Sequence, residues 1–426
     1  MSTVESTDQP LSGALETSRL QSEIDAAAAR GGGRVRIAAG VHRTGALRLR
    51  SGIELHLEAG ALLQFVPDPA LYPVVEARWE GATGPVYSPC LYARGESDVA
   101  ITGLGTIDGG GWQWWDTFRT RRAELAYPRP TLIGLHECER VTLSDLKLRS
   151  SPAWTVHPAL CQDVTISNIR ISNPADSPNT DGIDPESCRN VRISNCHIDV
   201  GDDCIAIKAG TEQTQDRVPC ENVVITNCTM VRGHGAVVIG SEMSGDVRNV
   251  AISTCVFQGT DRGIRIKTRR GRGGTVEDIR VTNVVMDDVV CPLTVNAFYF
   301  CGPEGKEPHV GDRSERPVDH GTPWIRGLQI AHVTAKNVHA SAAHVFGLPE
   351  APLRDLTIDD LRVSFASQPR AGKPEMAQGV EGRIRSGMEF GFVAGGMVSR
   401  VRLSGTEGEA VNAFQCEDLT FDVQGD

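Results

Sequence analysis

Two adjacent carboxylates open the segment GDDCIAIKAG at residues 201–210. Asp202 and Asp203 stand directly before a run of alternating apolar residues, which predicts a buried strand. Like charges side by side cost free energy unless an interaction or a reaction uses them. Such a pair in isolation is more often a solvated turn, because Asp favours turns. A chemical role therefore depends on which residues the fold brings beside the pair.

Other polar clusters occur at intervals that resemble a structural repeat. From Asp181 to Asp202 is 21 residues, from Asp202 to His234 is 32, and from His234 to Arg265 is 31. Equivalent positions of stacked parallel strands lie about 4.8 Å apart, so these steps predict that the clusters line up on one face. The clusters are NTDGID (179–184), GDD (201–203), GHG (233–235) and RGIRIK (262–267).

Acids gathered in one groove suit hydrolysis of a glycosidic bond. One carboxylic acid must protonate the leaving oxygen, and another carboxylate must activate a water. Three acids within a few ångströms cannot all stay ionised cheaply, so the pKa of one of them rises. Arg265 and Lys267 alternate with Ile264 and Ile266, so both cations project to one face. Two cations there predict recognition of a sugar carboxylate, which is the mark of a uronic acid.

Each motif taken alone has a simpler interpretation. NTDG is an ordinary turn, and His234 is more often a hydrogen-bonded surface residue. RGIRIKTRRGRGG is typical of a solvated basic edge strand. A competing interpretation is a calcium site built from Asp181, Asp184, Asp202 and Asp203. Only the joint occurrence of the motifs at repeat spacing favours a hydrolase.

A recurring phrase indicates what positions these clusters. A turn residue is followed by two alternating segments, as in DVTISNIRISNP (163–174) and NVVITNCTMVRGHG (222–235). One such unit cannot close its own core, so neighbours must stack. We predict an all-β, single-domain, right-handed parallel β-helix; a leucine-rich repeat and a sandwich fit less well. The anchor residues step by 23, 27, 32, 27 and 29 residues along Val141, Val164, Val191, Val223, Val250 and Ile279.

The two ends of the repeat region have their own signals. Leu20, Ile24 and Ala27 are spaced for a helix that Gly31–Gly33 ends, and we expect this helix to cap the solenoid. Residues 1–14 are predicted to be a flexible N-terminus and residues 15–426 a β-helical catalytic domain. Two polar segments rich in Pro and Gly, 301–325 and 366–382, are predicted loops.

Composition narrows the class of partner and the compartment. The 426-residue chain has a net charge of −11, which argues against nucleic acid, although a local basic patch can still bind an anion. No run of 18 apolar residues predicts a membrane helix, and no secretory signal opens the chain, so we expect a cytoplasmic protein. The 12 cysteines form no CxxC or zinc pattern and are expected to be buried free thiols.

The four motifs NTDGID, GDDCIAIKAG, GHGAVVIGSEMSG and RGIRIKT, in this order, resemble the polygalacturonases of glycoside hydrolase family 28. The resemblance covers about residues 15–300. It implies a right-handed parallel β-helix and inverting hydrolysis of α-1,4-galacturonosyl bonds in pectin, without metal or cofactor. The implied partner is a pectin-derived oligogalacturonide, and the oligomeric state is left open.

The resemblance also implies roles for single residues. Asp202 is expected to be the general acid, Asp181 and Asp203 the pair that activates water, and His234 the residue that tunes the acid.

A second group of residues is expected to bind the substrate. Arg265 and Lys267 would hold the galacturonate carboxylate, and Asn179 would support the site. Tyr299, in VNAFYFCGPEGK, is expected to contact the sugar.

GSEMSG and FYFCGPEGK are more similar to the bacterial exo-acting branch, in which the loop after residue 300 would close one end of the groove. Trp112, Trp114 and Trp115 either stack on sugar or pack beneath it. The alternatives are a hydrolase of a related uronic-acid glycan (rhamnogalacturonan or xylogalacturonan type), a calcium-dependent pectate lyase, and a non-catalytic carbohydrate-binding β-helix.

Overall fold

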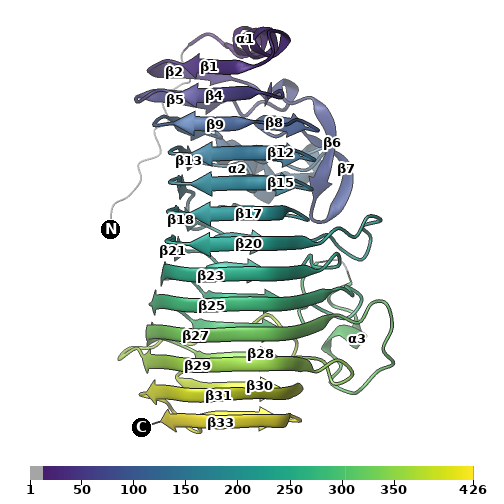
Figure 1. The fold of residues 1–426 in the computed structure, drawn as a ribbon, viewed down its shortest axis with the longest axis vertical. Helices are drawn as coiled ribbons and strands as arrows, with labels where there is room; N and C mark the ends of the chain where they lie inside the picture. Colours follow the sequence, from purple (N-terminus) through teal and green to yellow (C-terminus); the bar gives the residue numbers. More distant parts are fainter. Residues whose placement is uncertain (1–12, 303, 426) are drawn as a thin grey trace.

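The computed structural model describes residues 13–302 and 304–425. Strands stack along one long axis, with the N-terminal turns at one end and the C-terminal turns at the other (Figure 1). The strands of successive turns pair in parallel throughout the two long sheets, which confirms the predicted parallel β-helix. The helical segments are α1 Thr17–Ala29, α2 Gly111–Thr120 and α3 Pro308–Gly311, with the 3₁₀ turns η1 Pro69–Leu71 and η2 Arg122–Glu124.

One 20-stranded sheet runs the length of the molecule. Its strands are β1 Gly33–Ile37, β2 Gly40–Thr44, β4 Ile53–Leu57, β5 Ala61–Phe65, β9 Ala100–Gly103, β10 Thr106–Asp108, β12 Glu139–Ser144, β13 Lys147–Arg149, β15 Gln162–Ser167, β16 Arg170–Ser172, β17 Arg189–Ser194, β18 His197–Val200, β20 Cys220–Thr226, β21 Thr229–Arg232, β23 Val247–Gln258, β25 Thr275–Asp287, β27 Trp324–Val338, β29 Leu353–Phe365, β31 Val393–Ser404 and β33 Glu417–Gly425.

Three smaller sheets complete the architecture. The four-stranded sheet holds β3 Leu47–Arg48, β8 Leu91–Arg94, β11 Ile133–His136 and β14 Val156–Ala159. The seven-stranded sheet holds β19 Ile205–Ile207, β22 Val237–Ile239, β24 Arg262–Lys267, β26 Cys291–Asn296, β28 Ser341–Phe346, β30 Ser386–Gly391 and β32 Val411–Phe414. An antiparallel hairpin consists of β6 Val74–Trp79 and β7 Ala82–Tyr87.

The predicted repeat is the register of the large sheet. Val164 pairs with Val141 on one side and with Val191 on the other, and the remaining anchor residues continue the ladder to Ile279. These side chains are buried, so each step of the sequence repeat is one turn of the solenoid. Turns of different length keep a common core register because their extra residues lie in loops between the strands.

The N-terminal end is closed as predicted. Leu20, Ile24 and Ala27 of α1 are buried against the first turn, and Figure 1 shows this helix over β1 and β2. The predicted flexible segment 1–14 falls, apart from residues 13 and 14, outside the described residues. Within residues 13–302 and 304–425, none of the helices has both the length and the apolar character needed to cross a membrane.

The cysteines are free thiols, and 10 of the 12 are buried, as the sequence indicates. Several occupy equivalent places in successive turns: the backbone N–H of Cys138 donates to the sulfur of Cys161, and that of Cys161 donates to the sulfur of Cys188. These thiols fill the core as small apolar groups.

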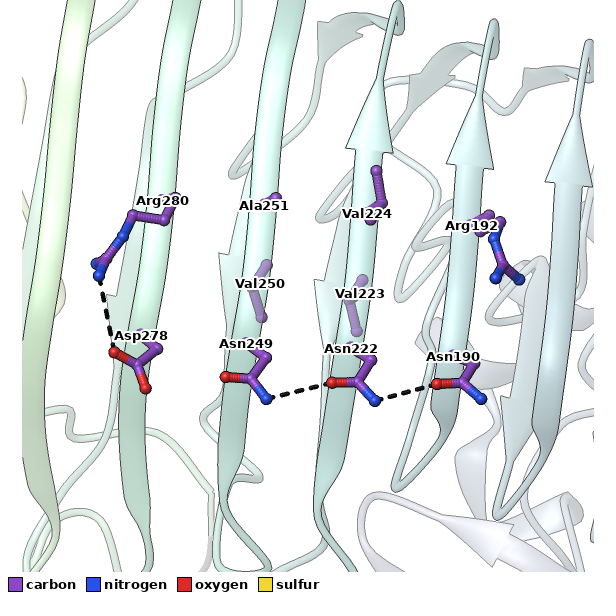
Figure 2. A pocket seen from close by; sticks show the side chains of 10 residues that line it. All are labelled: Asn190, Arg192, Asn222, Val223, Val224, Asn249, Val250, Ala251, Asp278 and Arg280. Carbon is purple, nitrogen blue, oxygen red and sulfur yellow. Dashed lines mark hydrogen bonds and ion pairs between the residues drawn. The ribbon is translucent and has the colours of Figure 1, made fainter.

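Asparagines in a left-handed backbone conformation lead the chain into the strands of the large sheet. Asn190, Asn222 and Asn249 have φ of 60°, 58° and 56°. Asn222 donates to Asn190 at 3.0 Å and Asn249 donates to Asn222 at 3.2 Å, forming the amide ladder seen in Figure 2. The ladder lines a shallow depression on the outer face of the sheet that contains none of the predicted site residues. It therefore serves the register of the turns.

We expect Asn222→Ala to lower the free energy of unfolding by about 2 kcal/mol, measured by chemical denaturation. Left-handed backbone costs a residue with a Cβ about 1–2 kcal/mol, and the lost hydrogen bonds add about 1 kcal/mol. Asn222→Gly is the control, because glycine tolerates this φ but lacks the amide, and it should lose less. Equal losses in both variants would contradict a contribution from backbone conformation.

Candidate active site

The seven-stranded sheet and the turn before it bring the predicted acids together. Ile183 forms a parallel bridge with Ile205, which places Asp181 beside Asp203 because each acid precedes its isoleucine by two residues. One oxygen from each of Asp181, Asp202 and Asp203 lies within 4.8 Å of the others. Three acids from two turns thus share one site, as the repeat predicts.

The clusters are offset from one another along the strands. Asp181 lies level with Asp203 and not with Asp202. His234 precedes Val237 by three residues, but Arg265 follows Ile264, the partner of Val237, by one. Turns of unequal length allow this offset, because only the buried ladder fixes the register. Arg265 lies within strand β24, and its guanidinium still comes near Asp203.

A cavity of about 500 Å³ opens over the acids. Six of the predicted residues line it: Asn179, Asp181, Asp202, Asp203, Lys267 and Tyr299. His234 and Arg265 do not line it. His234 lies beside Asp202, with 3.5 Å between its Nδ1 atom and Oδ1 of the acid. The proximity of Asp202 raises the pKa of His234 above its ordinary value, against the opposing effect of burial.

Asp203 is held as a carboxylate by cations from β24. Lys267 Nζ donates to its Oδ2 at 2.8 Å, and Arg265 Nη1 is 3.5 Å from its Oδ1. Burial alone would raise the pKa of Asp203, but Lys267 and then Arg265 outweigh it and hold the pKa below its usual range. The pairing across three turns keeps one acid of the cluster ionised.

Asp181 has the opposite electrostatics. Burial, followed by Asp184 and Asp202, raises its pKa well above the ordinary value. Asp184 is fully buried, and burial raises its pKa to about 8. The sequence analysis named Asp184 only as a competing calcium ligand. Its place near Asp181, whose pKa it raises, was missed.

Lys208 balances these buried acids and was also missed. Its Nζ atom lies 3.8 Å from Asp181, 3.7 Å from Asp184 and 3.6 Å from Glu242. Burial opposes its charge, but Glu242 and the two aspartates raise its pKa well above the ordinary value. The sequence did contain a signal, because Lys208 belongs to the motif GDDCIAIKAG and directly follows β19.

The aromatic wall of the cavity comes from residues that no motif marked. Trp154 stacks on Trp79 with ring centroids 4.6 Å apart, and Lys208 Nζ lies 4.7 Å from the Trp154 ring centre. Trp79 ends the first strand of the β6–β7 hairpin. Of the tryptophans considered from the sequence, Trp114 and Trp115 are buried in α2, and Trp112 is exposed. None of these three lines the cavity.

Asn179 and Tyr299 lie at the rim where the sequence placed them. Arg129 donates to Asn179 Oδ1 at 2.8 Å and so fixes its amide. The Tyr299 ring centre lies 5.3 Å from Lys267 Nζ and 5.6 Å from the Arg265 guanidinium carbon. Burial raises the pKa of the Tyr299 hydroxyl to about 12. Both residues can therefore orient the groups around Asp203.

The site combines Asp203, whose pKa is held low, with Asp181 and Asp184, whose pKa values are raised. General acid–base chemistry on a glycosidic bond needs this division. The three clustered oxygens also have the spacing of a cation site. Lys267 and Lys208 already place positive charge against Asp203 and Asp181, which disfavours a divalent ion there.

The fold and the site together define the class of protein: a parallel β-helix with a cleft lined by carboxylates. Residues 90–368 match the family model Glycosyl hydrolases family 28, and the chain belongs to this family. It is therefore a glycoside hydrolase.

Named relatives agree with this assignment. The chain is 34% identical to a probable polygalacturonase of Vitis vinifera over 86% of this chain and 74% of the relative. It is 31% identical to an endo-polygalacturonase of Pectobacterium carotovorum subsp. carotovorum over 71% of this chain and 79% of the relative. The crystal structure of a hyperthermoactive exopolygalacturonase from Thermotoga maritima superposes with a TM-score of 0.74 and 30% identity, covering 84% of this chain and 86% of that one.

The raised pKa of Asp184 predicts a pH dependence of stability. An unfolded Asp titrates near about 3.9, so the folded state takes up a proton and loses stability as the pH rises from about 4 to about 8. We expect Asp184→Asn to flatten this slope when thermal midpoints are compared at pH 5 and pH 8.

Asp163→Asn is the matched control for this measurement. Asp163 is a half-buried acid whose pKa is lowered by a hydrogen bond from Asn190, so its contribution to stability changes only at lower pH. It should keep the wild-type slope between pH 5 and pH 8. A slope in Asp184→Asn parallel to that of the wild type would contradict the proton uptake.

Proposed function

We propose that the protein is a polygalacturonase that removes galacturonate from one end of pectin-derived oligogalacturonides by inverting hydrolysis of α-1,4 bonds. The observation that carries the proposal is the cavity in which Asp202 lies beside the Asp203–Lys267 ion pair. Family membership and the polygalacturonase relatives support the substrate class.

In the proposed mechanism Asp202 protonates the leaving oxygen. It is the most exposed of the three acids, with 23% of its side chain accessible, so it can reach the glycosidic oxygen. His234, 3.5 Å from Asp202, sets the charge environment of this acid. Asp203, held ionised by Lys267, takes the proton of the attacking water, and Asp181 helps to position that water.

Recognition of a uronate is assigned to Lys267. Of the two cations predicted to bind the sugar carboxylate, only Lys267 lines the cavity, and Arg265 is 2% exposed. Lys208 and Arg272 add positive charge to the same wall. An ammonium group close to the acids favours a sugar that carries its own carboxylate over a neutral galactoside.

Exo action is supported by the segments that crowd one side of the cavity. The hairpin contributes Trp79, Glu80 and Ala82, and the loop after β26 contributes Cys301 and Gly302. Thr214 donates a hydrogen bond to the carbonyl of Gly81, which fastens the hairpin tip to the loop after β19. The similarity to the Thermotoga maritima exopolygalacturonase also supports exo action.

Asp202→Asn and Asp203→Asn should each lower kcat by at least about 1,000-fold, because each removes one of the proton-transfer groups. Hydrolysis of trigalacturonate is the assay, and circular dichroism verifies the fold. Asp163→Asn, on the outer face, should keep wild-type activity. Near-normal turnover in either site variant would contradict the role assigned to that residue. A wild-type protein that shows no turnover, with sugar binding unchanged in the variants, would indicate a binding protein.

Product analysis on tri- and tetragalacturonate tests the exo and inverting assignments. We expect monomer alone as the first product, released from one end, with the β-anomer formed first in proton NMR. The oxygens of the three acids lie within 4.8 Å of one another, a separation that does not by itself indicate inversion. Inversion is therefore inferred from the family resemblance, and the anomer that forms first tests it. Internal cuts would overturn exo action, and a chelator-sensitive unsaturated product would identify a lyase.

A further inference from the structure

Arg265 forms an ion pair with a carboxylate of the protein itself. Its Nε and Nη2 atoms donate to the two oxygens of Glu375 at 2.8 Å and 2.6 Å, which is a bidentate fork. Both residues are buried, with exposed fractions of 2% for Arg265 and 0% for Glu375. A substrate carboxylate therefore has no access to this face of the guanidinium.

Glu375 belongs to the polar loop between β29 and β30, and this loop is tied to the strands of the site. Arg262 of β24 donates to the carbonyls of Lys373 and Pro374, and Asn296 of β26 donates to that of Met376. Glu375 lies beyond residue 368, where the match to the family model ends.

The remaining donor of Arg265 faces the predicted base. Nη1 lies 3.5 Å from Asp203 Oδ1, somewhat longer than the usual range for this kind of hydrogen bond of about 2.7–3.2 Å. Asp203 Oδ2 already accepts from Lys267, whereas Oδ1 is buried and has no hydrogen-bond partner among the described residues. Oδ2 therefore anchors the acid, and Oδ1 is the oxygen on which Arg265 would close if it moved.

We propose that Glu375 is a positioning residue: it holds the Arg265 guanidinium near Asp203 without letting it close a second ion pair there, so that Asp203 keeps the orientation and basicity that its contact with Lys267 sets. The inference rests on the proposed function, because it assumes that Asp203 is the base. A buried guanidinium without Glu375 would seek its nearest other carboxylate, which is Asp203, and a closed ion pair there would occupy Oδ1.

The test is a comparison of kcat and KM for Glu375→Gln on trigalacturonate. We expect kcat to fall about 10- to 100-fold, because a displacement of about 1 Å at a reacting group has an effect of this size. KM should stay within about twofold, because neither Glu375 nor Arg265 lines the cavity. In an Arg265→Gln background the same Glu375→Gln change should alter kcat less than about twofold, because Glu375 acts through Arg265.

Glu350→Gln is the matched control. Glu350 also forms a buried bidentate pair, with Arg270 at 2.6 Å and 2.8 Å, and this pair lies outside the cavity lining. It should lower the thermal midpoint and leave kcat unchanged. Should Glu375→Gln fail to fold, Glu375→Asp keeps the charge, shortens the reach by one methylene, and should still lower kcat.

The outcomes separate this inference from the proposed function. Unchanged kcat in Glu375→Gln, with Asp203→Asn inactive, would overturn the role of Glu375 alone. Equal effects of Glu375→Gln with and without Arg265 would also overturn it, since Glu375 would then act independently of the arginine. A wild-type protein that releases no galacturonate would overturn the proposed function itself.

Discussion

The parallel register between turns is the constraint on which the site depends. Val191 stacks on Val164 and Val223 on Val191 whatever the length of the intervening loops, because their buried side chains fit only in that alignment. Rungs about 4.8 Å apart then force Asp181 and Asp203 to be neighbours. The hydrophobic core therefore maintains a cluster of like charges that the acids alone would not form.

That cluster is tolerable because charges of opposite sign are built in beside it. Lys267 compensates Asp203, and Lys208 lies among Asp181, Asp184 and Glu242. The compensation is uneven: Asp203 has a direct ammonium contact at 2.8 Å, whereas Lys208 stays at 3.6–3.8 Å from its three acids. Uneven compensation lowers the pKa of Asp203 and leaves those of Asp181 and Asp184 raised, and acid–base sites are built from such differences between neighbouring acids.

Sequence reasoning predicted the solenoid and its anchor residues, because a buried ladder leaves a period in the chain. It also predicted which acids meet, since their motifs recur at about one turn. Arg265 was predicted to bind the sugar carboxylate, but it is buried against Glu375 and does not line the cavity. Glu375 and Trp79 were unpredictable. Each reaches the site region from a loop or hairpin whose docking depends on tertiary contacts without a local pattern.

The β6–β7 hairpin gives the solenoid a contact that most stacked repeats lack. Arg78 donates to Glu186 and Ser187, and the carbonyl of Gly81 accepts from Thr214, across separations of 108, 109 and 133 residues. Solenoids usually couple only adjacent repeats, so local fraying stays local. Here the hairpin acts as a clasp between early turns and the loop after β19. Partial unfolding of the N-terminal turns would therefore displace residues that line the catalytic cleft.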